Sequence, residues 1–340
     1  MTTKFSRCLV TGGAGFIGSN FVRLACAEKW FDEIAVVDNL SYGGSLENLN
    51  GLGDRVQFNR VDIRDFDQLS SVFEAFKPDV VFHLAAQTHV DRSILTPEPF
   101  VTVNVLGTMN ILECCKRFSV PRLIHVSTDE VYGSADGGTS FSEVDPLNPS
   151  SPYSASKAGS DLLVLSYVKT FGLPAVITRS SNNYGPYQLP EKFIPVVITN
   201  LLEGDDVPIY GTGENIRNWI FVEDNCRGLY CAGTNGRVGE IYNIGGLKSA
   251  EISNLELAKM ICDLLGCNYA RLKFVKDRPG HDFRYSLTCE KARRELDWSP
   301  KVELLDGLKK TVNWYRENRE WWKKRRAELK DYYRQNYANR

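Results

Sequence analysis

The stretch that decides the fold is residues 9–18, LVTGGAGFIG. A short β-branched run ends in this stretch, and a helical pattern over 16–29 follows it. The glycines of the turn, Gly12, Gly15 and Gly18, let the backbone approach a pyrophosphate, and the helix aims its positive N-terminus at the same point. The stretch therefore predicts a strand–turn–helix unit that binds a dinucleotide.

The first half of the chain repeats this alternation of strand and helix. Buried strands are expected at 7–12, 33–38, 56–62, 80–85, 122–128 and 175–180, and helices at 16–29, 65–76, 98–118 and 153–171. Alternation of this kind predicts a parallel sheet covered on both faces. With right-handed crossovers, the fold class is α/β, a doubly wound parallel Rossmann sheet.

The second half is less regular and predicts a smaller α/β substrate-binding lobe. Its loops are rich in Pro, Gly and polar residues, as binding loops are. Helices are expected at 191–203, 253–265, 289–296 and 304–330. We predict an NAD-binding domain over 1–180, with returning segments near 215–245, and a lobe over 181–340 that mainly binds substrate.

Composition narrows the class of protein. The chain has 340 residues, 43% of them hydrophobic, with a net charge of −1, so a nucleic-acid or membrane partner is not expected. The N-terminus lacks the long apolar run of a signal peptide. Nine cysteines without a C-x-x-C pair indicate reduced thiols and a cytoplasmic protein. The four histidines show no metal-binding spacing, so no metal site is expected.

Acidic residues at the ends of two strands indicate which dinucleotide binds. Asp38 lies 20 residues after Gly18 at the end of the second strand, where it can accept hydrogen bonds from an adenosine ribose. It would repel a 2′-phosphate, which favours NAD over NADP. Asp62 ends the third strand and can bond the adenine amine. Ala85 and Ala86, after the fourth strand, leave room for the dinucleotide.

Two further motifs carry chemistry. SPYSASKAG places Tyr153 and Lys157 four residues apart on one helix face. A lysine ammonium and a nicotinamide cation nearby would favour the phenolate, so Tyr153 could accept a proton from a substrate hydroxyl. STDEVYG, residues 127–133, places Asp129 and Glu130 at the end of the fifth strand. Redox chemistry alone does not need two carboxylates there, so a further reaction step is indicated.

With these motifs the chain resembles the extended short-chain dehydrogenase/reductase family, and among its members the sugar-nucleotide 4,6-dehydratases. The resemblance runs nearly from end to end. It rests on TGGAGFIGSNFVR, HVDRSI, VSTDEVYG, SPYSASKAGSDLLV, RSSNNYGPYQLPEKFIP, GENIRNWIFVEDNCRGLY, DRPGHD and RRELDWSP.

The resemblance implies a reaction. Tyr153 is the base and Lys157 its support while NAD oxidises the sugar at C4, and Thr128 bonds the C4 oxygen. The ketone acidifies the C5 proton, which Glu130 removes, and Asp129 protonates the departing C6 hydroxyl. Hydride then returns to C6, so NAD is regenerated. Adjacent carboxyls in different environments can hold the two protonation states that this requires.

The resemblance also implies the binding residues, position by position. Those matching cofactor contacts are Gly12, Gly15, Phe16, Ile17, Gly18, Asp38, Asn39, Leu40, Ser41, Asp62, Ile63, Leu84, Ala85, Ala86, Thr88, Tyr153, Lys157 and Asn183. Those matching substrate contacts are Thr88, Thr128, Asn182, Lys192, Phe193, Pro208, Ile209, Tyr210, Arg217, Asn254, Arg278, His281 and Tyr337. The expected substrate is dTDP-glucose, and the expected assembly is a homodimer in which helices 98–118 and 153–171 form a four-helix interface.

Two positions depart from the pattern of the resemblance, and several alternatives stay open. Gln87 and Thr88 stand where many members have Glu-Ser, and Val103 stands where many have Thr. UDP-glucose is the alternative substrate. A C4-epimerase or a decarboxylase of the same superfamily is an alternative enzyme, although Asp129 and Glu130 argue against both. A non-catalytic NAD-binding protein is the third alternative, and it would have no use for the catalytic set.

Overall fold

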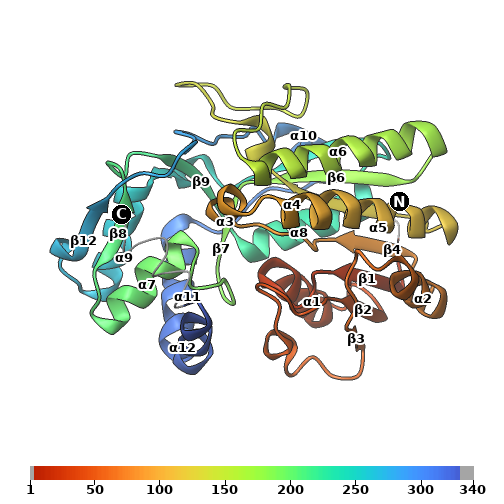
Figure 1. Ribbon diagram of the computed structural model, residues 1–340, viewed down its shortest axis with the longest axis horizontal. Helices are drawn as coiled ribbons and strands as arrows, with labels where there is room; N and C mark the ends of the chain where they lie inside the picture. Colours follow the sequence, from red (N-terminus) through yellow and green to blue (C-terminus); the bar gives the residue numbers. More distant parts are fainter. Residues whose placement is uncertain (1–3, 330–340) are drawn as a thin grey trace.

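The computed structural model describes residues 4–329. Its larger part is built on a sheet of seven parallel strands in the order β10-β6-β5-β4-β1-β2-β3 (Figure 1). The strands are β1 (Arg7–Thr11), β2 (Glu33–Val37), β3 (Val56–Asn59), β4 (Val80–His83), β5 (Leu123–Thr128), β6 (Ala175–Ser180) and β10 (Ile241–Ile244). The strand order reverses between β1 and β4, and ligands of doubly wound sheets bind outside the carboxyl ends at that point.

Helices cover both faces of this sheet because the strands are apolar on both sides. Leu9 and Ala35 pack with α2 (Phe66–Phe76), α5 (Thr108–Arg117) and α6 (Pro152–Phe171). Their neighbours Val10 and Val36 point the opposite way and pack with α1 (Phe16–Glu28) and α8 (Val222–Asn235). Successive strand residues face opposite sides, so continuous apolar runs give two cores. The predicted doubly wound Rossmann sheet is confirmed.

The second region has its own core and lies to the left in Figure 1. It contains α7 (Phe193–Glu203), α9 (Asn254–Leu265), α11 (Leu304–Glu317) and α12 (Arg319–Glu328). Two small sheets complete it: β8 (Val207–Tyr210) with β12 (Leu272–Val275), and β7 (Asn182–Tyr184), β9 (Ile216–Phe221) and β11 (Glu251–Ser253). Trp219 and Trp322 are buried at its centre. The division of the chain into domains stays a prediction.

Several observed elements differ from the predicted ones. The helix expected over 304–330 is two helices, because the chain turns at Asn318 between α11 and α12. The helix expected over 98–118 is continuous, but α4 (Glu98–Val101) and α5 flank a wider π-helical turn over 102–107. The short helix α3 (Val90–Leu95), α8, and the strands after β6 were not predicted.

Two general properties complete the description. All nine cysteines are free thiols, and seven of them are buried. Within residues 4–329, no helix combines the length and the apolar character that crossing a membrane requires.

Candidate active site

The carboxyl end of β5 carries the first group of site residues. His83, the last residue of β4, pairs with His125 of β5, so β5 extends three residues further and ends at Thr128. A short 3₁₀ helix follows, and the Thr128 hydroxyl caps it by accepting a hydrogen bond from the Glu130 amide at 3.2 Å. This cap fixes Asp129 and Glu130 directly beyond the edge of the sheet.

The two neighbouring carboxyls have different electrostatic surroundings. Asp129 is 3% exposed, and burial, followed by the charge of Glu130, raises its pKa to about 8. Burial also raises the pKa of Glu130, but the cations of Arg278, Lys192 and Arg217 oppose the rise. The surroundings therefore favour the proton on Asp129, whereas the three cations favour the charged form of Glu130, and this difference suits an acid beside a base.

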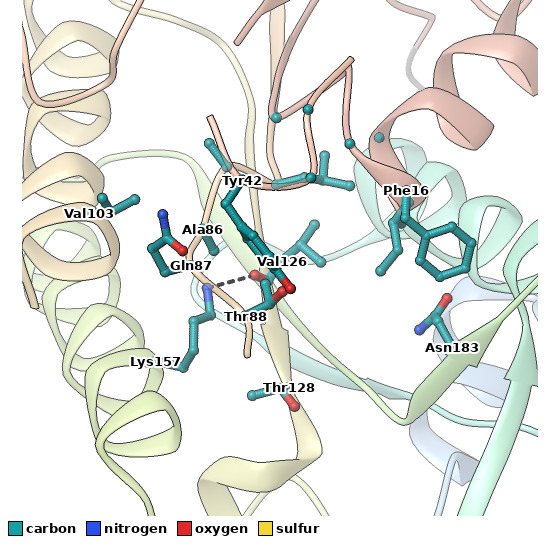
Figure 2. A pocket seen from close by; sticks show the side chains of 18 of the residues that line it. Phe16, Tyr42, Ala86, Gln87, Thr88, Val103, Val126, Thr128, Lys157 and Asn183 are labelled. Atoms are coloured by element: carbon teal, nitrogen blue, oxygen red, sulfur yellow. Dashed lines mark hydrogen bonds between the residues drawn. The ribbon is translucent and has the colours of Figure 1, made fainter. Parts of the chain in front are cut away.

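Tyr153 and Lys157 stand in the first two turns of α6. Ser151 and Ser154 form a capping box, and Pro152 occupies the first turn, so the start of this helix is fixed. Lys157 donates from Nζ to the carbonyl oxygen of Val126 on β5 at 2.9 Å, as Figure 2 shows. Burial lowers the pKa of this lysine to about 8.

The protein alone raises the pKa of Tyr153, and the predicted phenolate relies on a nicotinamide cation as well as on Lys157. Burial, followed by the charge of Glu130, raises that pKa, and a hydrogen bond with the Thr128 hydroxyl opposes the rise. The ammonium of Lys157 is committed to the Val126 carbonyl. The protein surroundings of Tyr153 therefore favour the neutral phenol.

A single cavity joins this catalytic end to the glycine-rich turn. It extends from Asp38 and Asp62 past the turn to Asp129, Glu130 and Lys192. The turn has no room for side chains: a Cβ on Gly12 would lie 2.7 Å from the backbone nitrogen of Ala85. The result is a bare backbone surface at the N-terminus of α1, which suits a pyrophosphate.

The acidic residues at the far end are held in place by local hydrogen bonds. Asp38 accepts from the backbone amides of Ala14 at 3.0 Å and Leu40 at 2.9 Å. Asp62 accepts from Arg64 at 2.8 Å and from the Asn39 side chain at 2.9 Å. The bond to Arg64 lowers the pKa of Asp62 to about 2, so this carboxylate is ionised at neutral pH.

The cavity fits a dinucleotide. Within the described residues, the side-chain oxygens Ser127 Oγ, Asn182 Oδ1 and Asn183 Oδ1 are buried without hydrogen-bond partners, and all three residues line the cavity. Buried polar atoms are nearly always hydrogen-bonded, so these atoms point to a ligand. In Figure 2, Phe16 and Asn183 lie on the side of the cavity opposite Lys157.

Most predicted cofactor residues line this cavity. They are Gly12, Gly15, Phe16, Ile17, Gly18, Asp38, Asn39, Ser41, Asp62, Ile63, Leu84, Ala85, Ala86, Thr88, Tyr153, Lys157 and Asn183, and the predicted substrate residues Thr128, Asn182 and Lys192 join them. Leu40 does not line the cavity; its backbone amide donates a hydrogen bond to the Asp38 carboxylate.

The sequence missed several lining residues, including Tyr42, Gly43 and Gly44 of the loop after Asp38 and Gln188 and Leu189 of the loop before α7. Gly43 and Gly44, five and six residues after Asp38, were the available signal for the first loop.

Gln87 and Val103, two residues that depart from the pattern of the resemblance, lie beside one another in the cavity wall (Figure 2). The backbone amide of Gln87 donates to Asn104 Oδ1 at 2.8 Å, and Asn104 returns a bond to the Gln87 carbonyl at 3.0 Å. Asn104 stands in the π-helical turn that also carries Val103. The Asn104 side chain thus fixes the backbone at residue 87, and the side chains of Gln87 and Val103 do not take part in these bonds.

Beyond Glu130, the second region supplies positive charge. Arg217 is 5% exposed, and its guanidinium donates to the Asp282 carbonyl at 2.9 Å and lies over the Tyr285 ring. Arg278 follows β12, and Lys192 donates to the Thr88 carbonyl at 2.9 Å. His281 lies next to the Tyr210 ring. Three cations around one carboxylate form a site suited to an anion.

The structure does not bring all the remaining predicted substrate residues to this cationic group, since Pro208 lines a separate pocket beside Trp322 and Lys323. Phe193 stacks on Trp219, the Ile209 side chain is buried in the core, and Pro208 precedes it on β8. Asn254 begins α9 next to Asn215, two residues before Arg217. Tyr337 lies outside the described residues.

Comparisons with known proteins agree with this geometry. The family model described as GDP-mannose 4,6 dehydratase matches residues 9–311. A dTDP-glucose 4,6-dehydratase of Actinoplanes sp. is 50% identical over 323 residues, which cover 93% of this chain and 99% of the relative. A protein of the same name from Neisseria meningitidis serogroup B is 48% identical, with 93% and 95% of the two chains covered.

Solved structures of a dehydratase and of an epimerase share this fold. The dTDP-glucose 4,6-dehydratase DesIV of Streptomyces venezuelae, solved with NAD bound, is 49% identical with a TM-score of 0.90 over 94% of this chain and 99% of its own. A UDP-glucose 4-epimerase of Thermus thermophilus in complex with NAD is 33% identical, with a TM-score of 0.86 over 92% and 99%.

Proposed function

The chain belongs to the GDP-mannose 4,6 dehydratase family of extended short-chain dehydrogenases/reductases, and we propose that it is an NAD-dependent dTDP-glucose 4,6-dehydratase. The observation that carries this proposal is the Asp129–Glu130 pair, which shares one cavity with Tyr153, Lys157 and the glycine-rich turn. An epimerase or a simple dehydrogenase has no step that needs such a pair. The product is dTDP-4-keto-6-deoxyglucose.

The first step is removal of a proton from the C4 hydroxyl. Bound NAD supplies the oxidation of C4 and the later reduction of C6, and its nicotinamide carries the positive charge that Tyr153 lacks in the protein alone. Thr128 holds the C4 oxygen, and the Tyr153 oxygen accepts the C4 hydroxyl proton. Lys157, fixed to Val126, keeps a buried ammonium beside this exchange.

The carboxyl groups of Glu130 and Asp129 carry out the elimination step. The C4 ketone acidifies the C5 proton, and the Glu130 carboxylate accepts it. Asp129, whose raised pKa keeps it protonated, donates its proton to the C6 oxygen, and that oxygen leaves as water. After C6 is reduced, the proton returns to C5, so the net change is loss of one water.

The cationic group supports a nucleoside diphosphate as the anion that anchors the sugar. Lys192, Arg217 and Arg278 lie near Glu130, at the open end of the catalytic residues, and the guanidinium groups can bind phosphate bidentately. We assign Phe193, Pro208, Ile209, Tyr210, Asn254 and His281 to the nucleotide side of this site. The cofactor residues named above take NAD.

The assembly proposed is a homodimer in the cytoplasm. Val101, Leu106 and Leu162 are 54%, 42% and 58% exposed on the helical segment 98–117 and on α6. Those helices pack against each other on one face of the sheet, and large exposed apolar side chains in one area mark an interaction surface. Nine free thiols support a reducing compartment.

The test is mass spectrometry of the purified protein incubated separately with dTDP-glucose and with UDP-glucose, without added reductant. Loss of one water from the dTDP sugar, with no net reduced cofactor, is expected. Loss of water from the UDP sugar in preference would keep the reaction and overturn the nucleotide. Interconversion of glucose and galactose with no change in mass would overturn the dehydratase.

A further inference from the structure

The carboxylate of Asp91, on α3, has no part in the chemistry described so far. Asp91 is 4% exposed. Its Oδ1 lies 3.1 Å from a terminal guanidinium nitrogen of Arg278, and its Oδ2 accepts from the Tyr210 hydroxyl at 3.0 Å. Both partners belong to the proposed nucleotide side of the site, so Asp91 contacts two substrate residues without being one of them.

These two bonds join separate regions of the fold. Asp91 belongs to α3, which packs on α4 and α6 beside the large sheet. Tyr210 ends β8, and Arg278 follows β12, the strand that pairs with β8. One buried carboxylate therefore fixes both strands of the small parallel sheet relative to the catalytic helix α6.

The next residue of α3 extends this link toward the cofactor. Arg92 lies 3.4 Å from Glu191, the neighbour of Lys192, and its guanidinium lies over the ring of Tyr42 in the loop after Asp38. Through two successive residues, α3 thus contacts the loop after Asp38, the neighbour of Lys192 and the nucleotide side of the site. This arrangement suits an element that sets the spacing between the two ligands.

The guanidinium of Arg278 is held by one end. Asp91 engages a terminal nitrogen, while Nε is buried without a hydrogen-bond partner among the described residues. A guanidinium presents five N–H donors in one plane and can bind a carboxylate and a phosphate at the same time. The unsatisfied Nε marks where a second anion fits.

We propose that Asp91 is a positioning residue for the substrate: it holds Arg278 and Tyr210 in the arrangement that binds the diphosphate of the sugar nucleotide. This inference rests on the proposed function, in that the ligand is a nucleoside diphosphate sugar. Asp91 also offsets the charge of the largely buried Arg278 guanidinium before the substrate arrives, so the site keeps its shape when empty.

The test is Asp91→Asn in the full-length protein with NAD. The amide can still accept from Tyr210 but offers Arg278 no anion. We expect the Kd of dTDP and the KM for dTDP-glucose to rise roughly tenfold or more, the range that coupling between contacting residues reaches, while kcat changes by less than about threefold. A dTDP Kd within twofold of wild type would overturn the inference.

A double-mutant cycle with Arg278→Gln separates positioning from a merely structural role. If Asp91 acts through Arg278, the double variant binds dTDP about as weakly as Arg278→Gln alone; additive losses would overturn the inference. Asp306→Asn, which removes an exposed carboxylate paired with Lys309, is the matched control with unchanged binding. Melting temperature and NAD content show whether each variant is folded.

A conservative variant and the wild-type protein together separate a failure of this inference from a failure of the proposed function. Asp91→Glu keeps the negative charge but moves it by one methylene, so its Kd for dTDP should lie between those of wild type and Asp91→Asn. If Asp91→Asn does not fold, Asp91→Glu decides: a Kd for dTDP equal to that of wild type would overturn the inference. Wild-type protein that binds dTDP but releases no water from dTDP-glucose would overturn the proposed function alone. Wild-type protein that binds neither dTDP nor UDP would overturn both.

Discussion

Lys157 Nζ lies 2.9 Å from the carbonyl oxygen of Val126, and this bond joins α6 to β5 two residues before Thr128. It sets the distance between the two halves of the proposed catalytic group, one on the helix and one at the strand end. Asp161, one turn further along α6, opposes the loss of the Lys157 charge by burial. The lysine thus has a positional role as well as an electrostatic one.

We therefore expect Lys157→Met to lower kcat by about 10²–10⁴-fold, the contribution of a positioned proton-transfer system. The variant keeps the length of the side chain but loses the ammonium and the bond to Val126. Steady-state kinetics with dTDP-glucose check this, and NAD content measures any loss of cofactor. Lys169→Met, on the last turn of the same helix, is the matched control and should leave kcat unchanged. A kcat within tenfold of wild type would contradict the role.

Glu130→Gln and Tyr153→Phe should stop the reaction at different steps. The first variant keeps the proton acceptor for C4 but cannot remove the C5 proton, so reduced cofactor should accumulate with substrate. The second lacks the C4 proton acceptor, so little should accumulate. Near-ultraviolet absorbance of the reduced nicotinamide, followed in stopped flow, checks both. Equal accumulation in the two variants would overturn the assignment of roles.

Sequence and structure agree most closely where local signals are strong. The six strands of the first half alternate with helical segments, and glycines mark the first turn, so six of the seven strands of the large sheet and most of the cavity lining could be predicted. Tyr153 and Lys157 could be paired because four residues make one helical turn. The end of β5 could be found because an apolar run stops at two acids.

The rest depends on long-range packing that no local pattern encodes. Asp91 meets Arg278 across 187 residues of sequence, and Tyr210 across 119. The short strands β7, β9 and β11 have no alternating pattern of their own and exist because they pair with one another. The direction of the Lys157 ammonium could not be predicted either, because it is set by a hydrogen bond to the carbonyl of Val126 on another element.

The rate should fall in alkaline solution. Asp129 acts as an acid, and its pKa of about 8 means that the required proton is present below that pH and lost above it. Lys157, whose pKa is also about 8, loses its positive charge over the same range. Both effects have the same sign, so kcat is expected to decline above about pH 8. A pH profile of kcat checks this, and a constant kcat up to about pH 10 would contradict both assignments.

The exposed apolar side chains of α6 and the 98–117 segment should control the state of assembly. Leu162→Glu places a charge in the proposed interface, where burial without a partner is unfavourable, so the variant should be mainly monomeric. Sedimentation velocity compares it with wild type. Val144→Glu is the control, because Val144 is 91% exposed in a loop that joins β5 to α6. A monomeric wild type, or a dimeric Leu162→Glu, would contradict the proposed interface.

Helix α12 should contribute to cofactor binding although it lies in the second region. Trp321 donates from its indole nitrogen to Asn48 Oδ1 at 2.9 Å, and Asn48 donates to the Ala14 carbonyl of the glycine-rich turn at 2.9 Å. Arg325 reaches the same loop and lies 2.9 Å from Glu47. This chain of contacts holds the loop after Asp38 against the turn.

Asn48→Ala removes both bonds at a residue that is 1% exposed. We expect a loss of about 1–3 kcal/mol in the free energy of unfolding, because buried polar partners are left unsatisfied, together with faster loss of NAD. Thermal unfolding with and without added NAD measures the two effects, and the difference between the two melting temperatures should change. Asn50→Ala, two residues further at an exposed position, is the matched control. Equal retention of NAD by Asn48→Ala and wild type would show that α12 only stabilises the second region.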